Sequence, residues 1–118
     1  MTASASSAAA HTTRRGDIWW VDFDPTQGSE MRKTRPAVVV TADALNRARR
    51  TVVVVPLSTG PEPRPPIVVA VPSAGQRSVA VCDQVRAVDK RRFSRTDGRL
   101  TPADMRSVEE GLRRILEL

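Results

Sequence analysis

The chain has 118 residues, of which 40% are hydrophobic and only 3% aromatic, and its formal net charge is +6. This length fits one domain with a single core, and no apolar run reaches the ~20 residues that a membrane-spanning helix needs. With one cysteine, Cys82, the chain excludes an intrachain disulfide and a thiolate metal cluster, and we expect Cys82 to be a buried small hydrophobe. The basic charge indicates a nucleic-acid or acidic-protein partner, unless it reflects only an arginine-rich surface.

The first 13 residues, MTASASSAAAHTT, form a low-complexity segment rich in Ala, Ser and Thr. They lack the basic start and the leucine-rich core of a signal peptide. We therefore expect a disordered tail over residues 1–13, a folded domain over residues 14–118 and a cytoplasmic location. The only histidine of the chain, His11, lies in this tail, so no function is expected of it.

Two apolar segments with strand-forming residues flank a polar loop early in the domain. The first predicted strand covers residues 18–23, rich in aromatic and branched side chains, and the second covers about 35–41. Pro36 follows Arg35 directly, and a proline is tolerated at the first residue of a strand. The pattern therefore predicts that Arg35 is held at the beginning of a strand. The loop before it contains the polar residues Ser29, Glu30, Arg32 and Lys33.

The middle of the chain continues as short strands separated by turns. A capped helical turn is predicted over 41–46, and the valine run 51–55 indicates a strand that is buried on both faces. Five prolines within residues 56–66 exclude helix and central strand, so this segment is predicted to be a stiff loop. Further strands are expected over 67–71 and over 79–88, the latter interrupted around Cys82, Asp83 and Gln84.

The end of the domain changes to helical periodicity after a basic turn over residues 89–92. Thr101 and Pro102 have the sequence of a helix start, and apolar residues recur at helical spacing as far as Leu116. We predict an amphipathic helix from about residue 102 to the end. Five or six short strands and one helix predict a mainly β fold with a C-terminal α-helix, built as a small, strongly bent antiparallel sheet or barrel.

The residue types of the domain exclude much of ordinary catalysis. Residues 14–118 contain no histidine and no tyrosine, so most nucleophilic mechanisms are excluded. Asp17, Asp22 and Asp24 are interpreted as turn and cap residues, and no metal ion or other cofactor is expected. RNA cleavage is still feasible, because the attacking 2′-hydroxyl belongs to the substrate and the protein only aligns it and stabilises charge.

A fixed arginine and a nearby hydroxyl are the groups that such chemistry requires. Arg35 can clamp a phosphate bidentately, although a guanidinium stays protonated and cannot act as an ordinary base. Ser58 and Thr59 follow the valine-rich strand and could donate to the same phosphate. The alternative interpretation is an ordinary β-hairpin with a solvated loop and simple loop hydroxyls.

Several segments together resemble the MazF/PemK (Kid) family of toxin endoribonucleases. The matching segments, over residues 14–118, are GDIWWVDFDPT (16–26), GSE (28–30), Arg35–Pro36, VPLST (55–59) and DQVR (83–86). The resemblance implies an SH3-like antiparallel β-barrel, a homodimer, metal-independent and sequence-selective cleavage of single-stranded RNA, and inhibition by an acidic, MazE-like cognate antitoxin.

The resemblance also assigns roles to individual residues. Arg35 matches the catalytic arginine of the family, and Ser58 lies where many members carry a catalytic threonine. The residues expected to contact RNA are Ser29, Glu30, Arg32 and Lys33 in the first loop, and Asp83, Gln84 and Arg86 further along the chain.

Two departures from the family pattern leave alternatives open. Serine at 58 keeps the hydroxyl but loses the methyl group that restricts χ1, and the adjacent Thr59 is the alternative hydroxyl. The proline-rich loop 60–66 either narrows the choice of RNA sequence or protects a strand edge. Two rival functions remain. One is a non-enzymatic CcdB-like gyrase poison, although residues 115–118 at the end of the chain lack the tryptophan-glycine signature expected there. The other is a decayed toxin that binds RNA or antitoxin without cleaving.

Overall fold

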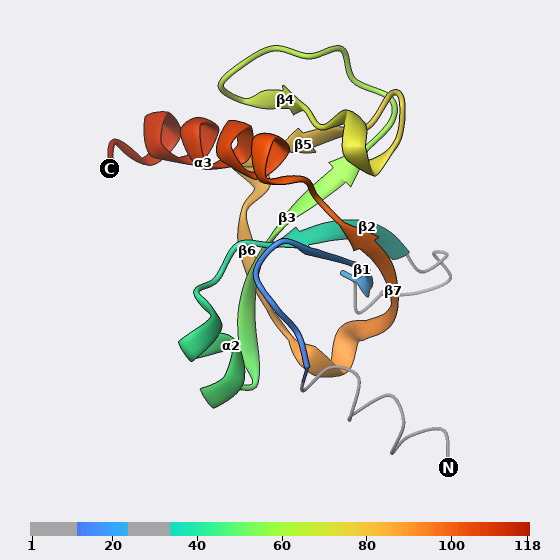
Figure 1. The fold of residues 1–118 in the computed structure, drawn as a ribbon, viewed down its shortest axis with the longest axis vertical. Helices are drawn as coiled ribbons and strands as arrows, with labels where there is room; N and C mark the ends of the chain where they lie inside the picture. Colours follow the sequence, from blue (N-terminus) through green and yellow to red (C-terminus); the bar gives the residue numbers. More distant parts are fainter. Residues whose placement is uncertain (1–11, 24–33) are drawn as a thin grey trace, which may run out of the picture.

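A computed structural model describes residues 12–23 and 34–118, and it shows an antiparallel sheet with a helix packed across one side (Figure 1). The strands are β1 (Asp17–Asp22), β2 (Thr34–Val39), β3 (Thr51–Ser58), β4 (Val68–Ala70), β5 (Val79–Val81), β6 (Arg86–Asp89) and β7 (Phe93–Arg99). The helices are α2 (Asp43–Ala48) and α3 (Pro102–Leu116), with short 3-10 turns η1 (Pro72–Ala74), η2 (Cys82–Gln84) and η3 (Lys90–Arg92). The predicted fold class, mainly β with a C-terminal α-helix, is confirmed.

The long strand β3 organises the sheet. The strand order is β4-β5-β3-β2-β1-β7, and β6 pairs with β3 outside this path. Thr51–Val54 of β3 pair with β6, whereas Leu57 and Ser58 pair with β5. Because β3 changes partner along its length, the sheet bends strongly around it (Figure 1). The path ends at β4 and β7, so the sheet is barrel-like but not closed.

Alternation along the strands separates two apolar clusters. Val38 and Val55 belong to a cluster between the sheet and α3, and Val39 and Val54 belong to a second cluster inside the bend of the sheet. Neighbouring residues of a strand point to opposite faces, so one valine run supplies both clusters. This confirms the prediction that the strand over 51–55 is buried on both faces.

The C-terminal helix begins as its sequence predicts. The Thr101 hydroxyl accepts a hydrogen bond from the Asp104 backbone N–H at 3.2 Å, and Pro102 occupies the first turn. The buried Asp104 carboxylate also accepts a 2.8 Å bond from the Ser73 backbone N–H. The start of α3 is therefore fastened to η1. None of the helices in the described part of the chain is long and apolar enough to cross a membrane.

Three details differ from the sequence prediction. Strand β7 was not predicted, so the described part of the chain has seven strands rather than five or six. Strand β3 continues through Pro56 to Ser58 instead of ending at residue 55. Helix α2 starts at Asp43 after Ala42, whose side chain cannot cap it, and the Thr41 hydroxyl is bonded to Val53 of β3 instead.

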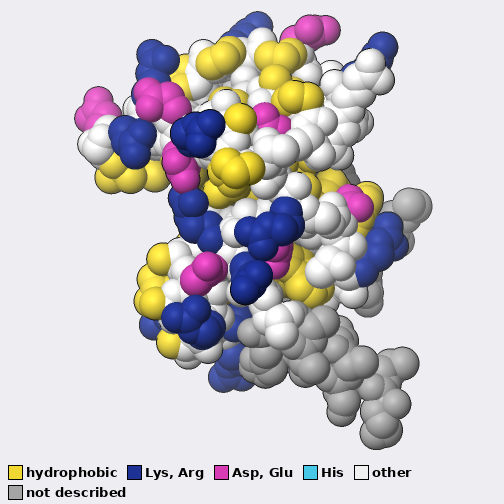
Figure 2. All heavy atoms as spheres, viewed as in Figure 1, with side chains coloured by type: hydrophobic (Ala, Val, Ile, Leu, Met, Phe, Trp, Pro, Cys, Tyr) yellow, Lys and Arg dark blue, Asp and Glu magenta, His cyan; other side chains and the backbone are white. Residues whose placement is uncertain are grey.

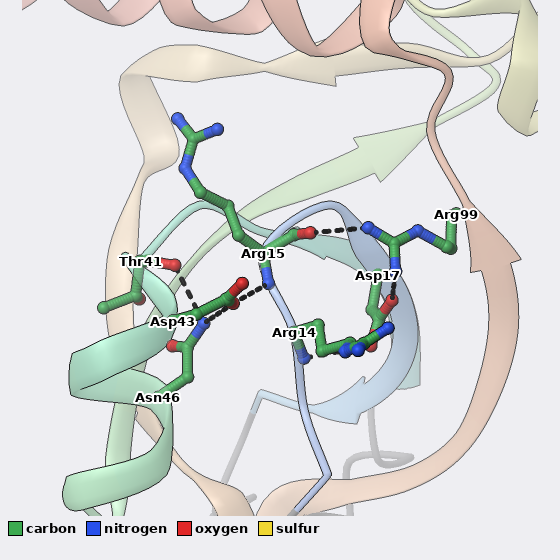
Figure 3. A network of polar contacts seen from close by, with 7 residues as sticks. All are labelled: Arg14, Arg15, Asp17, Thr41, Asp43, Asn46 and Arg99. Atoms are coloured by element: carbon green, nitrogen blue, oxygen red, sulfur yellow. Dashed lines mark hydrogen bonds and ion pairs between the residues drawn. The ribbon is translucent and has the colours of Figure 1, made fainter.

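A polar network fixes the beginning of β1 against α2 and β7 (Figure 3). The Arg15 backbone N–H donates to the Asp43 carboxylate at 2.7 Å, and this hydrogen bond is the main cause that lowers the pKa of Asp43. The Arg99 guanidinium donates to the Arg15 carbonyl at 3.0 Å and forms a 3.2 Å ion pair with Asp17. The start of β1 is therefore anchored on both sides, which holds the strand that carries Trp20.

Candidate functional site

Arg35 lies near the beginning of β2, as predicted. It is the second residue of the strand and is paired with Val21 of β1, while Pro36 is paired with Trp20. The Arg35 side chain is exposed. Because its pairing with Val21 of β1 fixes its backbone, the guanidinium projects from a strand rather than from a loop tip.

A pocket of about 250 Å³ contains Arg35 and both predicted hydroxyl residues. Its lining combines apolar surface with one cation and three hydroxyls, and consists of Trp20, Arg35, Pro36, Leu57, Ser58, Thr59 and Ser78. The register that pairs Ala37 with Pro56 brings the end of β3 beside the beginning of β2. Sheet pairing therefore joins groups that are more than twenty residues apart in the sequence.

The two candidate hydroxyls are held differently. Ser58 is half-buried, ends β3 and is paired with Val79 of β5, whereas Thr59 is exposed on the loop that follows. The Ser58 hydroxyl oxygen accepts a hydrogen bond from the Gly60 backbone N–H at 3.3 Å. That bond leaves the hydroxyl proton available to a ligand. Ser58 is thus the better positioned donor of the two.

Trp20 is a pocket residue that the sequence analysis did not identify as functional. Trp19 is buried and packs on Phe93 with ring centroids 5.1 Å apart, so the next residue of the strand faces the other way. Trp20 is half-buried and lines the pocket. The guanidinium carbon of Arg95 lies over the Trp20 ring, 4.7 Å from the ring centroid. The pair of adjacent tryptophans was the sequence signal for this residue. Neighbouring residues of a strand point to opposite faces, so only one of the two tryptophans can lie on the buried face.

The other predicted RNA-contacting residues are not part of this pocket. Asp83 and Gln84 are exposed on η2, and Arg86 begins β6 with its guanidinium 5.3 Å from the Phe23 ring centroid. None of these three lines the Arg35 pocket. The predicted residues of the first loop lie outside the described residues and are Ser29, Glu30, Arg32 and Lys33.

Lys and Arg side chains are spread over the face in Figure 2 with acidic side chains among them, so they form no single basic patch there. Within residues 12–23 and 34–118, no three His, Cys, Asp or Glu side chains gather in a metal-binding group. Cys82 is fully buried as predicted, and burial raises the pKa of its thiol to about 11.

Comparison with known proteins shows the family to which this chain belongs. Residues 14–116 match the family model of the PemK-like, MazF-like toxins of type II toxin–antitoxin systems. The chain belongs to this family. The resemblance found in the sequence is therefore confirmed, and the pocket formed by Arg35 and Ser58 lies within the matched residues.

Relatives in the PemK/MazF family match along most of their length. The endoribonuclease MazF9 of Mycobacterium tuberculosis is 33% identical over 114 residues, which cover 89% of this chain and 97% of the relative. The endoribonuclease toxin MazF of Escherichia coli K12 is 36% identical over 97 residues, covering 80% and 85%. A mycobacterial endoribonuclease in complex with its cognate antitoxin superposes with a TM-score of 0.77 at 26% identity, covering 91% of this chain and 97% of that one.

Proposed function

We propose that this PemK/MazF-family toxin is an endoribonuclease that cleaves single-stranded RNA at selected sequences without a metal ion. The proposal is supported by the pocket whose lining includes both Arg35 and Ser58 together with apolar residues. The curated relatives named above are endoribonucleases, which supports the same reaction. The substrate supplies the nucleophile, so the absence of histidine and tyrosine from residues 14–118 is compatible with catalysis.

In the proposed reaction, the 2′-oxygen attacks the adjacent phosphorus and the bond from phosphorus to the 5′-oxygen breaks. The products are a 2′,3′-cyclic phosphate and a 5′-hydroxyl; the 2′-hydroxyl loses its proton to solvent, and the leaving oxygen gains one. Arg35 binds the phosphate oxygens, stabilises the charge of the phosphorane and assists protonation of the leaving oxygen. Guanidinium donors fixed at a strand are well suited to this role, because they need little reorganisation.

Ser58 holds the scissile phosphate by a hydrogen bond, with Thr59 as an auxiliary donor. We expect Ser58→Ala to lower kcat/KM for RNA by about 10- to 100-fold, whereas Ser58→Thr keeps most of the activity because the hydroxyl remains. Thr59→Ala is the matched control and is expected to cost less, since Thr59 is exposed on the loop. Steady-state cleavage of a short fluorogenic RNA measures all three, and a larger loss in Thr59→Ala than in Ser58→Ala would reverse the assignment.

The substrate path extends beyond the pocket in this proposal. Asp83, Gln84 and Arg86 contact nucleotides away from the scissile phosphate, because none of them lines the Arg35 pocket. The first loop contributes Ser29, Glu30, Arg32 and Lys33 to the same path. The net charge of +6 favours binding of a polyanion along this path.

We further propose that the toxin acts in the cytoplasm as a homodimer that an acidic, MazE-like antitoxin neutralises. A mycobacterial relative has been solved with its cognate antitoxin, which supports a partner of this kind. Attraction between a basic toxin and an acidic segment accelerates their encounter. The association rate is therefore expected to fall by about tenfold or more between low salt and ~0.5 M NaCl, measured by stopped-flow fluorescence. An association rate that does not change with ionic strength would contradict this mechanism of encounter.

Cleavage of a long single-stranded RNA in EDTA tests the proposed function. Discrete cuts at one short motif, mapped by sequencing the fragment ends, are the expected result. Intact RNA after incubation with the folded protein would overturn the proposal, and inhibition of gyrase supercoiling by the same preparation would support the rival function instead.

A further inference from the structure

A second pocket, of about 400 Å³, adjoins the Arg35 pocket under the proline-rich loop. One wall is formed by residues 59–63 of the loop and the other by residues 76–79 before and at the start of β5. Thr59 and Ser78 line both pockets, so the two spaces lie side by side at these residues. An RNA strand whose scissile phosphate lies on Arg35 and Ser58 can therefore place a neighbouring nucleotide in the second pocket.

The walls of the second pocket are stiff before any ligand arrives. Pro61 and Pro63 have restricted backbone torsions, and Arg64 is hydrogen-bonded to Val68 in both directions, at 2.7 and 2.9 Å. On the opposite wall, the Ser78 backbone N–H donates to the Gly75 carbonyl at 2.9 Å. The backbone of both walls is therefore fixed before binding, and the exposed Glu62 and Arg77 side chains adjust to the ligand.

The polar groups of this pocket are complementary to a nucleobase rather than to a second phosphate. Glu62 supplies carboxylate oxygens that only accept hydrogen bonds, and Arg77 supplies guanidinium groups that only donate. Neither side chain forms an ion pair with another residue in the described part of the chain. A carboxylate repels a phosphate, whereas an acceptor and a donor in one pocket can bind a base that presents both types of group.

We propose that this pocket is a guanine-binding subsite for a nucleotide next to the scissile phosphate, an inference that rests on the proposed function. Guanine presents adjacent N1–H and N2–H donors that match the Glu62 carboxylate, and it presents O6 and N7 acceptors that match the Arg77 guanidinium. Adenine has neither the N1–H donor nor the O6 acceptor, uracil has no amino group, and cytosine has no N7 acceptor. The proline-rich loop therefore acts in sequence selection and does more than cover a strand edge.

The test uses short RNAs built on the mapped cleavage motif, with each of the four bases in turn at the two positions flanking the cut. The wild type is expected to prefer guanine at one of these positions, and Glu62→Gln is expected to lower kcat/KM for that RNA by about 10- to 100-fold. Replacing the guanine with inosine, which lacks the amino group, should slow the wild type but not Glu62→Gln. Replacing it with 7-deazaguanine should slow the wild type but not Arg77→Ala.

Arg64→Ala is the matched control, because Arg64 belongs to the same loop but does not line the pocket. Its base preference should equal that of the wild type. A wild type that cleaves RNA without preferring guanine at either flanking position would overturn the subsite while leaving the proposed function intact. The subsite would also be overturned, with the proposed function intact, if the guanine preference persists in Glu62→Gln or is lost equally in Arg64→Ala. A wild type that cleaves no RNA would instead overturn the proposed function together with this inference.

Discussion

Arg35→Ala is expected to lower RNA cleavage by about 10²- to 10³-fold or more while the protein keeps its fold. Removing one fixed donor that stabilises transition-state charge typically costs this much. The fold should persist because the Arg35 side chain is exposed and has no hydrogen bond or ion pair with another described residue. Single-turnover cleavage gives the rate, and circular dichroism with thermal unfolding verifies the fold.

Two further variants separate charge from geometry at this position. Arg35→Lys keeps the positive charge but loses the planar fork, so we expect activity between those of the wild type and Arg35→Ala. Arg49→Ala removes an exposed arginine at the end of α2, outside the pocket, and should cleave like the wild type. Retained turnover in Arg35→Ala would contradict the assignment of Arg35 as the catalytic residue.

Gly111→Ala is expected to destabilise the protein by about 1–3 kcal/mol, because a side chain at this residue of α3 would crowd the proline-rich loop, η2 and β4. A Cβ atom at Gly111 would lie 2.9 Å from the Pro66 carbonyl oxygen and 3.0 Å from the Cys82 sulfur. The oxygen belongs to backbone, so the helix or the loop has to move. Helix propensity alone predicts the opposite sign, a gain of about 1 kcal/mol for alanine over glycine.

Urea denaturation measures this difference, since the midpoint and slope give the free energy of unfolding. Arg106→Ala on the exposed side of the same helix is the control and should change stability by less than about 0.5 kcal/mol. A Gly111→Ala variant more stable than the wild type would show that α3 can move away without cost. Pro66 ends the proline-rich loop, so the Gly111 contact also fixes that end of the loop.

The parts of the fold that the sequence predicted have strong local patterns. The valine run of β3 and the start of α3 depend on alternation, periodicity and a cap that neighbouring residues supply. Strand β7 was missed because all of its residues except Phe93 are exposed, so its sequence shows no apolar alternation. Its pairing with β1 also contains register shifts, which no local pattern encodes.

The continuation of β3 through Pro56 has a tertiary cause. A proline inside an apolar run ordinarily predicts the end of a strand, because it lacks a backbone donor. In the structure, β3 pairs with β6 up to Val54 and with β5 from Leu57 onward. Pro56 lies between the segment of β3 that pairs with β6 and the segment that pairs with β5. On that edge of β3, no neighbouring strand needs a hydrogen bond from the backbone nitrogen of residue 56. Only the complete sheet shows that this position tolerates proline.

Only part of the candidate site was predicted, because the rest also depends on the complete sheet. Residue types and the resemblance to a family both paired Arg35 with the hydroxyls of Ser58 and Thr59. The pocket that joins them depends on the register of β2 against β3, which is a long-range property. Trp20 was missed because residue type alone does not show which face of the sheet a side chain occupies. Ser78 was missed because only the pairing of β3 with β5 brings it to the pocket.

In the proposed mechanism, the substrate's own 2′-hydroxyl attacks the phosphate held by Arg35 and Ser58. The most direct test places a single 2′-deoxynucleotide at the mapped cleavage position of an otherwise unmodified RNA, in EDTA. We expect the unmodified RNA to yield a 2′,3′-cyclic phosphate and a 5′-hydroxyl, and the deoxy-substituted RNA to remain intact at that position. Cleavage of the substituted RNA at the same phosphate would contradict this mechanism.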